Sequence, residues 1–252
     1  MGIFLKGIGI GNKISIGKVF IYEKKSIEVS EEKDQIPYEA KIEKLKELFE
    51  EVKRELDETY LEAKKLAPKE AEIFLFHKGI LEDKYVLEKI KSYLRKSYSL
   101  AYSISAAFYE IRKEFENMEQ ELFRERAKDI EDIRERVLEK ILDVKTFTLS
   151  KLPYPCIVIA RDLTPSDTAN LDLEKILGFV TEEGSRTSHT AILAQALGIP
   201  AVLGIKGIIS QVSNEEEIII DSEEGMVILK PSEEEKRAYL LKKEEKDKYY
   251  SE

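Results

Sequence analysis

The sequence predicts an α/β domain that is interrupted by an antiparallel four-helix bundle and followed by a C-terminal connector helix. Three observations predict this fold class. Residues 38–152 contain one glycine and one proline and are rich in Glu, Lys, Leu and Ala, a composition that favours helices. Short apolar runs between glycines precede this stretch, and strand-like and helix-like patterns alternate after it. We therefore expect the α/β domain at 1–22 and 148–230, the helical domain at 33–143 and the connector at 232–252.

The first segment, residues 3–22, has the pattern of strand, turn and strand. Its apolar side chains are separated by glycines and short polar residues. They are Ile8, Ile10, Ile14, Ile16, Val19, Phe20 and Ile21.

The middle of the chain shows helical periodicity. Three apolar sets recur at three- and four-residue steps, as on the buried face of a helix. They are Ile42, Leu45, Phe49, Val52, Leu56, Tyr60 and Ala63; Phe108, Ile111, Phe115, Met118 and Leu122; and Ile130, Ile133, Val137 and Ile141. Pro68 suits the first turn of a helix, and we expect a kink or break near Gly79 and Asp83. The alternative interpretation is a structural bundle or coiled coil without a site.

The last third alternates between strands and helices. We expect strands at 156–160, 176–182, 199–204, 216–221 and 226–230, and helices at 166–171 and 189–197. The final segment, 232–252, has the pattern of a charged amphipathic helix with little to bury.

Composition disfavours several kinds of partner and site. The 252 residues are 42% hydrophobic and carry a net charge of −9, which disfavours nucleic acid and anionic membranes and favours a basic protein partner. The single cysteine, Cys156, excludes an intramolecular disulfide, and two distant histidines do not suggest a metal site. Because the sequence lacks a signal-peptide pattern and an apolar run of about 18 residues, we expect a cytoplasmic location.

The stretch Gly184-Ser-Arg-Thr-Ser-His189 carries the strongest chemical signal. A loop of small residues that leads into a helix is an anion site, because the first backbone N–H groups of a helix are unpaired and its dipole is positive there. An imidazole at such a site suggests phosphoryl chemistry. The alternative for His189 is a core histidine at a helix start.

Longer motifs resemble a known family. TSHTAILA at 187–194 and LGIPAVLG at 197–204 resemble the phosphohistidine swivelling domain that enzyme I of the bacterial sugar phosphotransferase system shares with pyruvate phosphate dikinase and phosphoenolpyruvate synthase. AEIFLFHKGILED at 71–83, RERAKDIEDIRERVLEKIL at 124–142 and the region 160–190 resemble the N-terminal half of enzyme I specifically.

This resemblance implies phosphoryl transfer through a phosphohistidine at His189 to the carrier protein HPr. The residues that it implies as support for the phosphate site are Thr168, Gly184, Ser185, Arg186, Thr187, Ser188 and Thr190. The HPr-binding residues that it implies are Glu72, Leu75, Phe76, His77, Gly79, Ile80, Glu82, Arg126 and Glu131. No cofactor is expected in this chain. In the family, phosphoenolpyruvate and Mg²⁺ bind a C-terminal barrel that also forms the homodimer, so we expect this chain alone to be a monomer.

Other interpretations remain open for single residues. Thr168 could bond only to backbone, Arg186 could form a surface salt bridge, and His77 could be a packing residue. The chain departs from the family pattern at Ser185, where glycine is usual, and at Gln195, where arginine is usual. The turn 11–13 replaces Ser-Pro-Gly, and position 131 is acidic where relatives can be basic. Ser185 and Gln195 motivate one alternative, an HPr-docking regulatory paralogue with weak turnover. The shared signature leaves another, the swivelling domain of a dikinase-like enzyme, against which the helical region argues.

Overall fold

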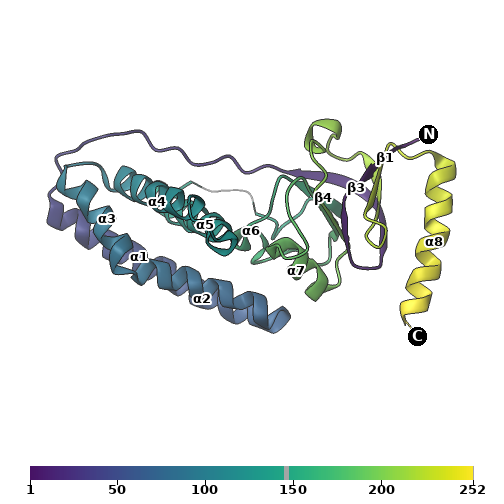
Figure 1. Ribbon diagram of the computed structural model, residues 1–252, viewed down its shortest axis with the longest axis horizontal. Helices are drawn as coiled ribbons and strands as arrows, with labels where there is room; N and C mark the ends of the chain where they lie inside the picture. The colour runs from purple at the N-terminus through teal and green to yellow at the C-terminus, as the bar shows by residue number, and fades with distance from the viewer. Residues whose placement is uncertain (145–147, 252) are drawn as a thin grey trace. The chain divides into compact units, whose positions relative to one another are not determined.

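The structure, a computed structural model, describes residues 1–144 and 148–251 (Figure 1). Contacts between Cα atoms divide the chain into two compact units. The α/β unit comprises 1–23, 148–163 and 170–252, and the helical unit comprises 24–147 and 164–169. Residues 164–169, which the sequence assigned to the α/β domain, therefore group with the helices. The physical reason is a set of hydrogen bonds to helix α5 (Glu121–Leu142), described below.

The α/β unit is built on one mixed sheet, which has eight strands in the described residues. The strands lie in the order β1-β8-β7-β3-β4-β5-β6-β2. They are β1 (Ile3–Lys6), β2 (Ile8–Ile10), β3 (Ile14–Tyr22), β4 (Cys156–Ala160), β5 (Ile176–Thr181), β6 (Ala201–Leu203), β7 (Glu217–Asp221) and β8 (Met226–Leu229). The four strands β3, β4, β5 and β6 are parallel, and the strands on either side of them pair antiparallel.

Burial on both faces explains the continuous apolar pattern of the central strands. All five residues of β4 are buried. Cys156 and Val158 belong to one apolar cluster, and Ile157 and Ile159 belong to another, because successive side chains of a strand point to opposite faces. Helix α7 (His189–Leu197) packs into the first cluster through Ala191 and Ala194. A short 3-10 helix, η1 (Ile209–Gln211), contributes its first residue to the second.

The C-terminal helix α8 (Glu233–Ser251) belongs to the α/β unit by its contacts. It contacts β3, and Tyr239 packs against the small cluster of Ile14, Ile219 and Ile228. None of its described residues is buried, as the charged pattern predicts. Residue 252 lies outside the described residues.

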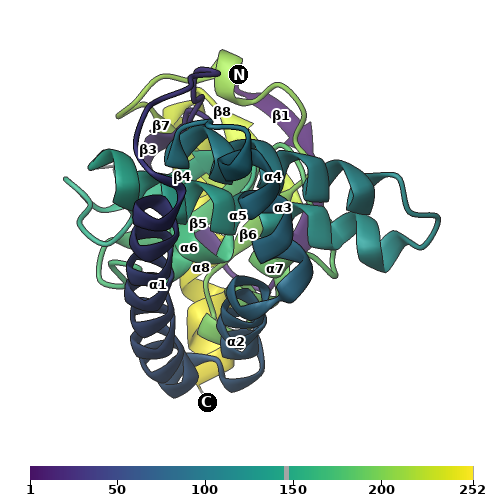
Figure 2. The same cartoon turned by 90° about the vertical axis from the view of Figure 1, so that its left-hand side faces the viewer.

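The described part of the helical unit contains α1 (Tyr38–Leu66), α2 (Pro68–Glu82), α3 (Lys84–Arg95), α4 (Leu100–Glu116), α5 (Glu121–Leu142) and α6 (Pro165–Thr168) (Figure 2). Pro68 occupies the first turn of α2, as expected. The expected break falls at Asp83, whose carboxylate accepts hydrogen bonds from the Tyr85 and Val86 N–H groups and so begins a new helix. Gly79, by contrast, lies inside α2.

The predicted apolar stripes largely form the core of this unit. The 42–63 set and the 130–141 set are buried or packed against the same cluster. The middle set is wrong beyond Phe115, because α4 ends at Glu116 and leaves Met118 38% and Leu122 59% exposed. Before α1, an extended segment runs along these helices (Figure 1) and places Ile27 and Val29 against the cluster.

Candidate functional site

The loop before His189 begins where the buried strand β5 ends. The Thr181 hydroxyl donates to the carbonyl of Glu183, and the Glu183 N–H donates to the carbonyl of Arg161 at 2.9 Å. Gly184 then adopts a φ of +122°, a backbone region that is essentially restricted to glycine. The glycine therefore turns the chain out of the sheet and toward the helix that carries His189.

Ser188 caps helix α7 and closes the loop. Its hydroxyl accepts a hydrogen bond from the Ala191 N–H at 3.4 Å and donates to the Ser185 carbonyl at 2.7 Å. The Ser188 N–H also donates to that carbonyl, at 3.0 Å. The cap leaves the first N–H groups of α7 pointing at the loop, with the positive end of the helix dipole.

The side chains of this loop are displayed to solvent. Ser185, Arg186 and Thr187 are exposed, and His189 is half-buried at the first position of α7. Arg186 makes no ion pair within the described residues. An exposed guanidinium next to an unblocked helix start is suited to an incoming dianion.

The side chain of Thr190 faces away from the loop before His189. Its side chain is 2% exposed, and its hydroxyl donates to the Leu163 carbonyl at 3.5 Å. The Thr190 hydroxyl is therefore turned into the α/β unit, so only its backbone N–H remains to bind a phosphate oxygen.

Thr168 lies at the end of α6, in the helical unit. Its hydroxyl lies 3.2 Å from the Thr164 carbonyl and 3.3 Å from the Pro165 carbonyl and donates to both. A Thr164–Asp167 capping box begins this short helix. The backbone bonds of Thr168 fit the interpretation as a helix-side hydroxyl, and its role in phosphoryl chemistry stays a prediction.

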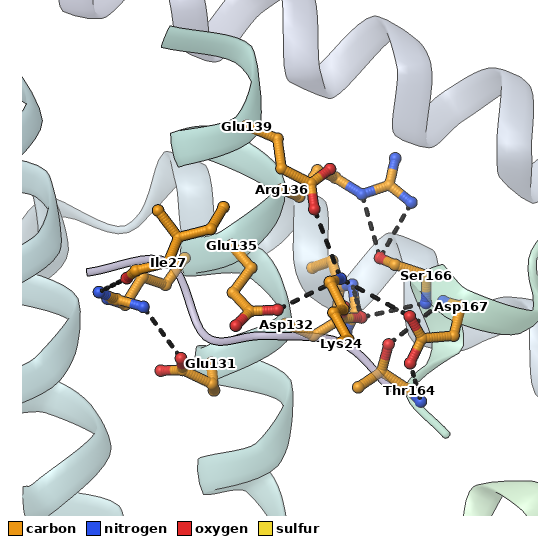
Figure 3. Close-up of polar contacts among 12 residues, drawn as sticks. Lys24, Ile27, Glu131, Asp132, Glu135, Arg136, Glu139, Thr164, Ser166 and Asp167 are labelled. Atoms are coloured by element: carbon orange, nitrogen blue, oxygen red, sulfur yellow. Dashed lines mark hydrogen bonds and ion pairs between the residues drawn. The ribbon is translucent and has the colours of Figure 1, made fainter. Parts of the chain in front are cut away.

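Charged side chains anchor α6 to α5, as Figure 3 shows. The Asp132 carboxylate accepts a hydrogen bond from the Ser166 N–H at 3.1 Å, and Arg136 donates to the Ser166 hydroxyl at 3.0 Å. Lys24 lies 3.2 Å from Glu135 and 3.6 Å from Asp167. Sequence reasoning missed this cluster, because it joins residues that are far apart in the chain and that follow no recognisable spacing.

The cluster perturbs two acid–base groups. Burial alone would lower the pKa of Lys24, but the carboxylates of Asp167, Glu135, Asp132 and Glu139 together raise that pKa well above its ordinary value. Burial raises the pKa of the Glu135 carboxyl, against the opposing effect of Lys24. Lys24 therefore keeps its charge across the physiological range and fixes α6 electrostatically.

Helix α2 presents most of the predicted partner-binding residues on one face. Glu72, Leu75, Phe76, Gly79 and Glu82 are exposed, at three- and four-residue steps. The Arg126 guanidinium of α5 lies over the Phe76 ring, 4.6 Å from its centroid. We call these six residues the α2 face.

Three residues of the predicted partner-binding set lie elsewhere. His77 is fully buried and Ile80 is 8% exposed, because they lie on the side of α2 that faces the core of the helical unit. Glu131 pairs with Arg112 of α4 at 2.8 Å and with Arg134 at 3.0 Å. None of these three side chains therefore belongs to the α2 face, and their part in partner binding stays a prediction.

Two departures from the family pattern meet in the α/β unit. A pocket of about 420 Å³ is lined by the turn Gly11–Lys13 and by Gln195, among other residues near the end of α7. Lys13 donates from its ammonium to the Gly198 carbonyl at 3.2 Å. A lysine thus supplies positive charge beside the neutral Gln195, at a helix end that has no basic residue of its own.

Comparisons with known proteins agree with this geometry. Residues 6–126 match the family described as the N-terminal domain of PEP-utilising enzymes, and residues 152–225 match the mobile domain of PEP-utilising enzymes. The chain is 33% identical to a phosphoenolpyruvate-protein phosphotransferase of Mycoplasma genitalium and 36% identical to one of Bacillus subtilis. These alignments cover 84% and 83% of this chain and 37% of each relative, so the chain spans little more than a third of their length.

Solved structures match along nearly the whole chain. An NMR solution structure of an Enzyme I protein aligns with a TM-score of 0.76 at 36% identity, covering 96% of this chain and 99% of that one. A structure titled as the N-terminal domain of Enzyme 1 - Nitrogen aligns with a TM-score of 0.59 at 19% identity and shows a shared fold. Of the helices in the described residues, none is long and apolar enough to cross a membrane.

Proposed function

Because the chain belongs to the enzyme I family of phosphoenolpyruvate-protein phosphotransferases, we propose that it transfers a phosphoryl group through His189 to an HPr-type carrier protein. This transfer would be the first step of the sugar phosphotransferase system. The observation that carries the proposal is the position of His189: a half-buried imidazole at the start of α7, preceded by an exposed loop of small residues and one unpaired arginine.

The proposed chemistry needs one nucleophile and a positive environment. The neutral His189 imidazole attacks phosphorus through Nε2, a new N–P bond forms, and the bond from phosphorus to the carrier's histidine breaks. The carrier's imidazole leaves with the electron pair of that bond, and the reverse sequence returns the phosphoryl group. Arg186 and the first N–H groups of α7 would stabilise the charge on the phosphoryl oxygens. We also propose, from the resemblance alone, that Thr168 assists the active histidine.

The carrier would dock on the α2 face. Leu75 and Phe76 expose 43% and 36% of their surfaces, and the carboxylates of Glu72 and Glu82 lie on the same side of the helix. A chain with a net charge of −9 attracts a carrier whose histidine has a basic rim. The apolar side chains would supply affinity, and the charges would steer encounter.

In the longer relatives, we propose that the phosphoryl group comes from phosphoenolpyruvate. There, a C-terminal barrel would bind phosphoenolpyruvate and Mg²⁺ and form the homodimer. Residues 1–252 alone should exchange a phosphoryl group with phosphorylated carrier and should not use phosphoenolpyruvate. We expect them to act in the cytoplasm as a monomer, without a resident cofactor.

A regulatory binding role is the second candidate. It is motivated by Gln195 and Ser185, which remove a charge and add a side chain relative to the family pattern. The Ser185 hydroxyl lies 3.1 Å from the Thr187 hydroxyl, so the loop accommodates it, and Lys13 supplies charge beside Gln195. These contacts favour turnover over a purely regulatory role. The dikinase-like alternative is disfavoured by the near-complete match to the Enzyme I structure.

Incubation with HPr carrying a labelled phosphohistidine tests the proposal. We expect label on the chain that is labile in acid and stable in base, as an N–P bond is. His189→Ala should accept no label, whereas His77→Gln, which alters the other histidine, should still be labelled. Binding of the carrier without any label on the wild-type chain would favour the regulatory role, and label on His189→Ala would disprove the assignment of the nucleophile.

A further inference from the structure

His77, the second histidine of the chain, is buried beneath the α2 face. None of its surface is exposed, and its ring lies near those of Phe74 and Phe76, whose centroids are 5.9 Å and 6.5 Å away. The contact with Phe74 is edge-to-face. Two aromatic neighbours and complete burial fix the orientation of the imidazole, so each ring nitrogen faces a defined direction.

The Nε2 atom of this ring faces the partly exposed carboxylate of Asp129. It lies 3.4 Å from Oδ1 of Asp129 on α5. The other oxygen of Asp129 lies 3.3 Å from the Arg126 guanidinium. That guanidinium lies over the Phe76 ring. A continuous chain of polar contacts therefore leads from the buried imidazole through Asp129 to the one cation of the α2 face.

The Nδ1 atom faces a second carboxylate. It lies 3.9 Å from Oδ2 of Asp132, and the same oxygen accepts the hydrogen bond from the Ser166 N–H of α6. Nδ1 of His77 and Oδ1 of Asp132 are both buried and have no hydrogen-bond partner among the described atoms. Of the two carboxylates, only Asp129 has its Oδ within hydrogen-bonding distance of the ring, so the hydrogen bond of His77 is directed outward, to the surface pair.

Asp129 needs such a partner to be held in place. Arg126 is 37% exposed and Asp129 is 13% exposed, so their ion pair is partly solvated and by itself weakly orienting. A hydrogen bond from a fully buried, immobile donor restricts the carboxylate, and a restricted carboxylate restricts the guanidinium that is paired with it. Less side-chain freedom is then lost when a partner binds.

We propose that His77 is a positioning residue for carrier docking, which acts through Asp129 to hold Arg126 over Phe76. This inference rests on the proposed function, since it requires that the carrier bind the α2 face. In this role His77 does not contact the carrier. It holds in place Arg126, which does.

A double-mutant cycle tests the proposal. The affinity of unphosphorylated carrier is measured by titration for the wild type, His77→Leu, Arg126→Ala and the double variant. We expect His77→Leu to weaken binding roughly tenfold when Arg126 is present and less than twofold in the Arg126→Ala background, because residues in one network are not additive. The KM for phosphorylated carrier should rise by the same factor as the dissociation constant, with kcat changed less than twofold.

Two further variants separate positioning from a general loss of stability. His77→Gln keeps a side-chain N–H donor, and we expect it to restore most of the affinity. Ile90→Val removes one buried methyl group from α3, which carries none of these residues, and should lower the melting temperature without affecting affinity. Should His77→Leu not fold, Asp129→Asn replaces it in the same cycle with the same expectation.

The outcomes of these experiments separate the positioning role of His77 from the proposed function. A wild-type chain that neither binds nor accepts label from the carrier contradicts the proposed function. A wild-type chain that binds, with a His77 or Asp129 effect that is absent or equal in both Arg126 backgrounds, overturns the positioning role and leaves the proposed function standing.

Discussion

The substitution Gly184→Ala tests whether the backbone of the loop before His189 sets up the phosphoryl site. Gly184 has a φ of +122°, which an alanine adopts only with strain. An added Cβ would lie 3.5 Å from Leu203 Cδ1, Ser188 Oγ and Thr181 Oγ1, which is ordinary van der Waals contact. The substitution therefore introduces backbone strain without a steric clash.

The size of the loss in stability follows from the backbone strain alone, because the added methyl group causes no clash. A non-glycine residue in such a sparsely populated region costs about 1–3 kcal/mol. With roughly 2–4 °C of melting temperature per kcal/mol for a chain of this size, the melting temperature should fall by about 2–12 °C. If the loop instead relaxes by shifting its carbonyls, the Ser188 cap moves, and a shift of about 1 Å at a reacting group lowers the transfer rate on the order of 100-fold.

Thermal unfolding and single-turnover labelling by phosphorylated carrier measure the two effects. Gly207→Ala is the matched control, since Gly207 also has a positive φ, +77°, with nothing within 4 Å of an added Cβ, and lies outside the loop. It should lose about 1 kcal/mol and keep its labelling rate. A Gly184→Ala variant with unchanged melting temperature and unchanged rate would refute the claim that this backbone conformation matters.

Three further predictions concern single side chains. His189→Ala should abolish phosphoryl acceptance. Its free energy of unfolding, measured with denaturant, should lie within about 1 kcal/mol of the wild-type value, because the half-buried residue begins a helix and belongs to no core cluster. Charge reversal at Glu72 or Glu82 should slow carrier association and flatten its salt dependence, and Phe76→Ser should speed dissociation, as stopped-flow mixing would show. Burial, aided by Asp172, raises the pKa of the Cys156 thiol from 9.0 to about 11. At pH 8 the folded chain should therefore hold roughly 100-fold less thiolate than the unfolded chain and be alkylated correspondingly more slowly. Mass spectrometry at timed intervals measures the alkylation rate.

Local sequence patterns were sufficient for most elements of the fold. The absence of glycine and proline predicts the helical region, and the buried stripe Leu45, Phe49, Val52 and Leu56 lies where its spacing places it. The strand at 156–160 and the helix at 189–197 have the predicted boundaries, since each is bounded by its own turn or capping residues. Periodicity failed at Met118 and Leu122, because a pattern does not show where a helix ends when no glycine or proline marks the end.

The loop and His189 at its helix start were also accessible from sequence, since a capping serine, a glycine and an imidazole within six residues determine a local geometry. The tertiary structure alone decided which side chains surround them. Nothing in the spacing of Thr190 shows that its hydroxyl faces Leu163, and nothing near Lys24 predicts the four carboxylates that raise its pKa.

Helix α2 shows this difference between local pattern and tertiary packing most clearly. Sequence alone predicted that residues 71–83 lie on a helix that carries apolar side chains beside acidic ones. Only the fold decided that His77 is inside, because its burial depends on the aspartates that α5 turns toward α2, and the contact with Asp129 spans 52 residues of chain. Helical periodicity is set by each residue's near neighbours, whereas the partner of a buried polar group is set by packing between elements, which no local pattern encodes.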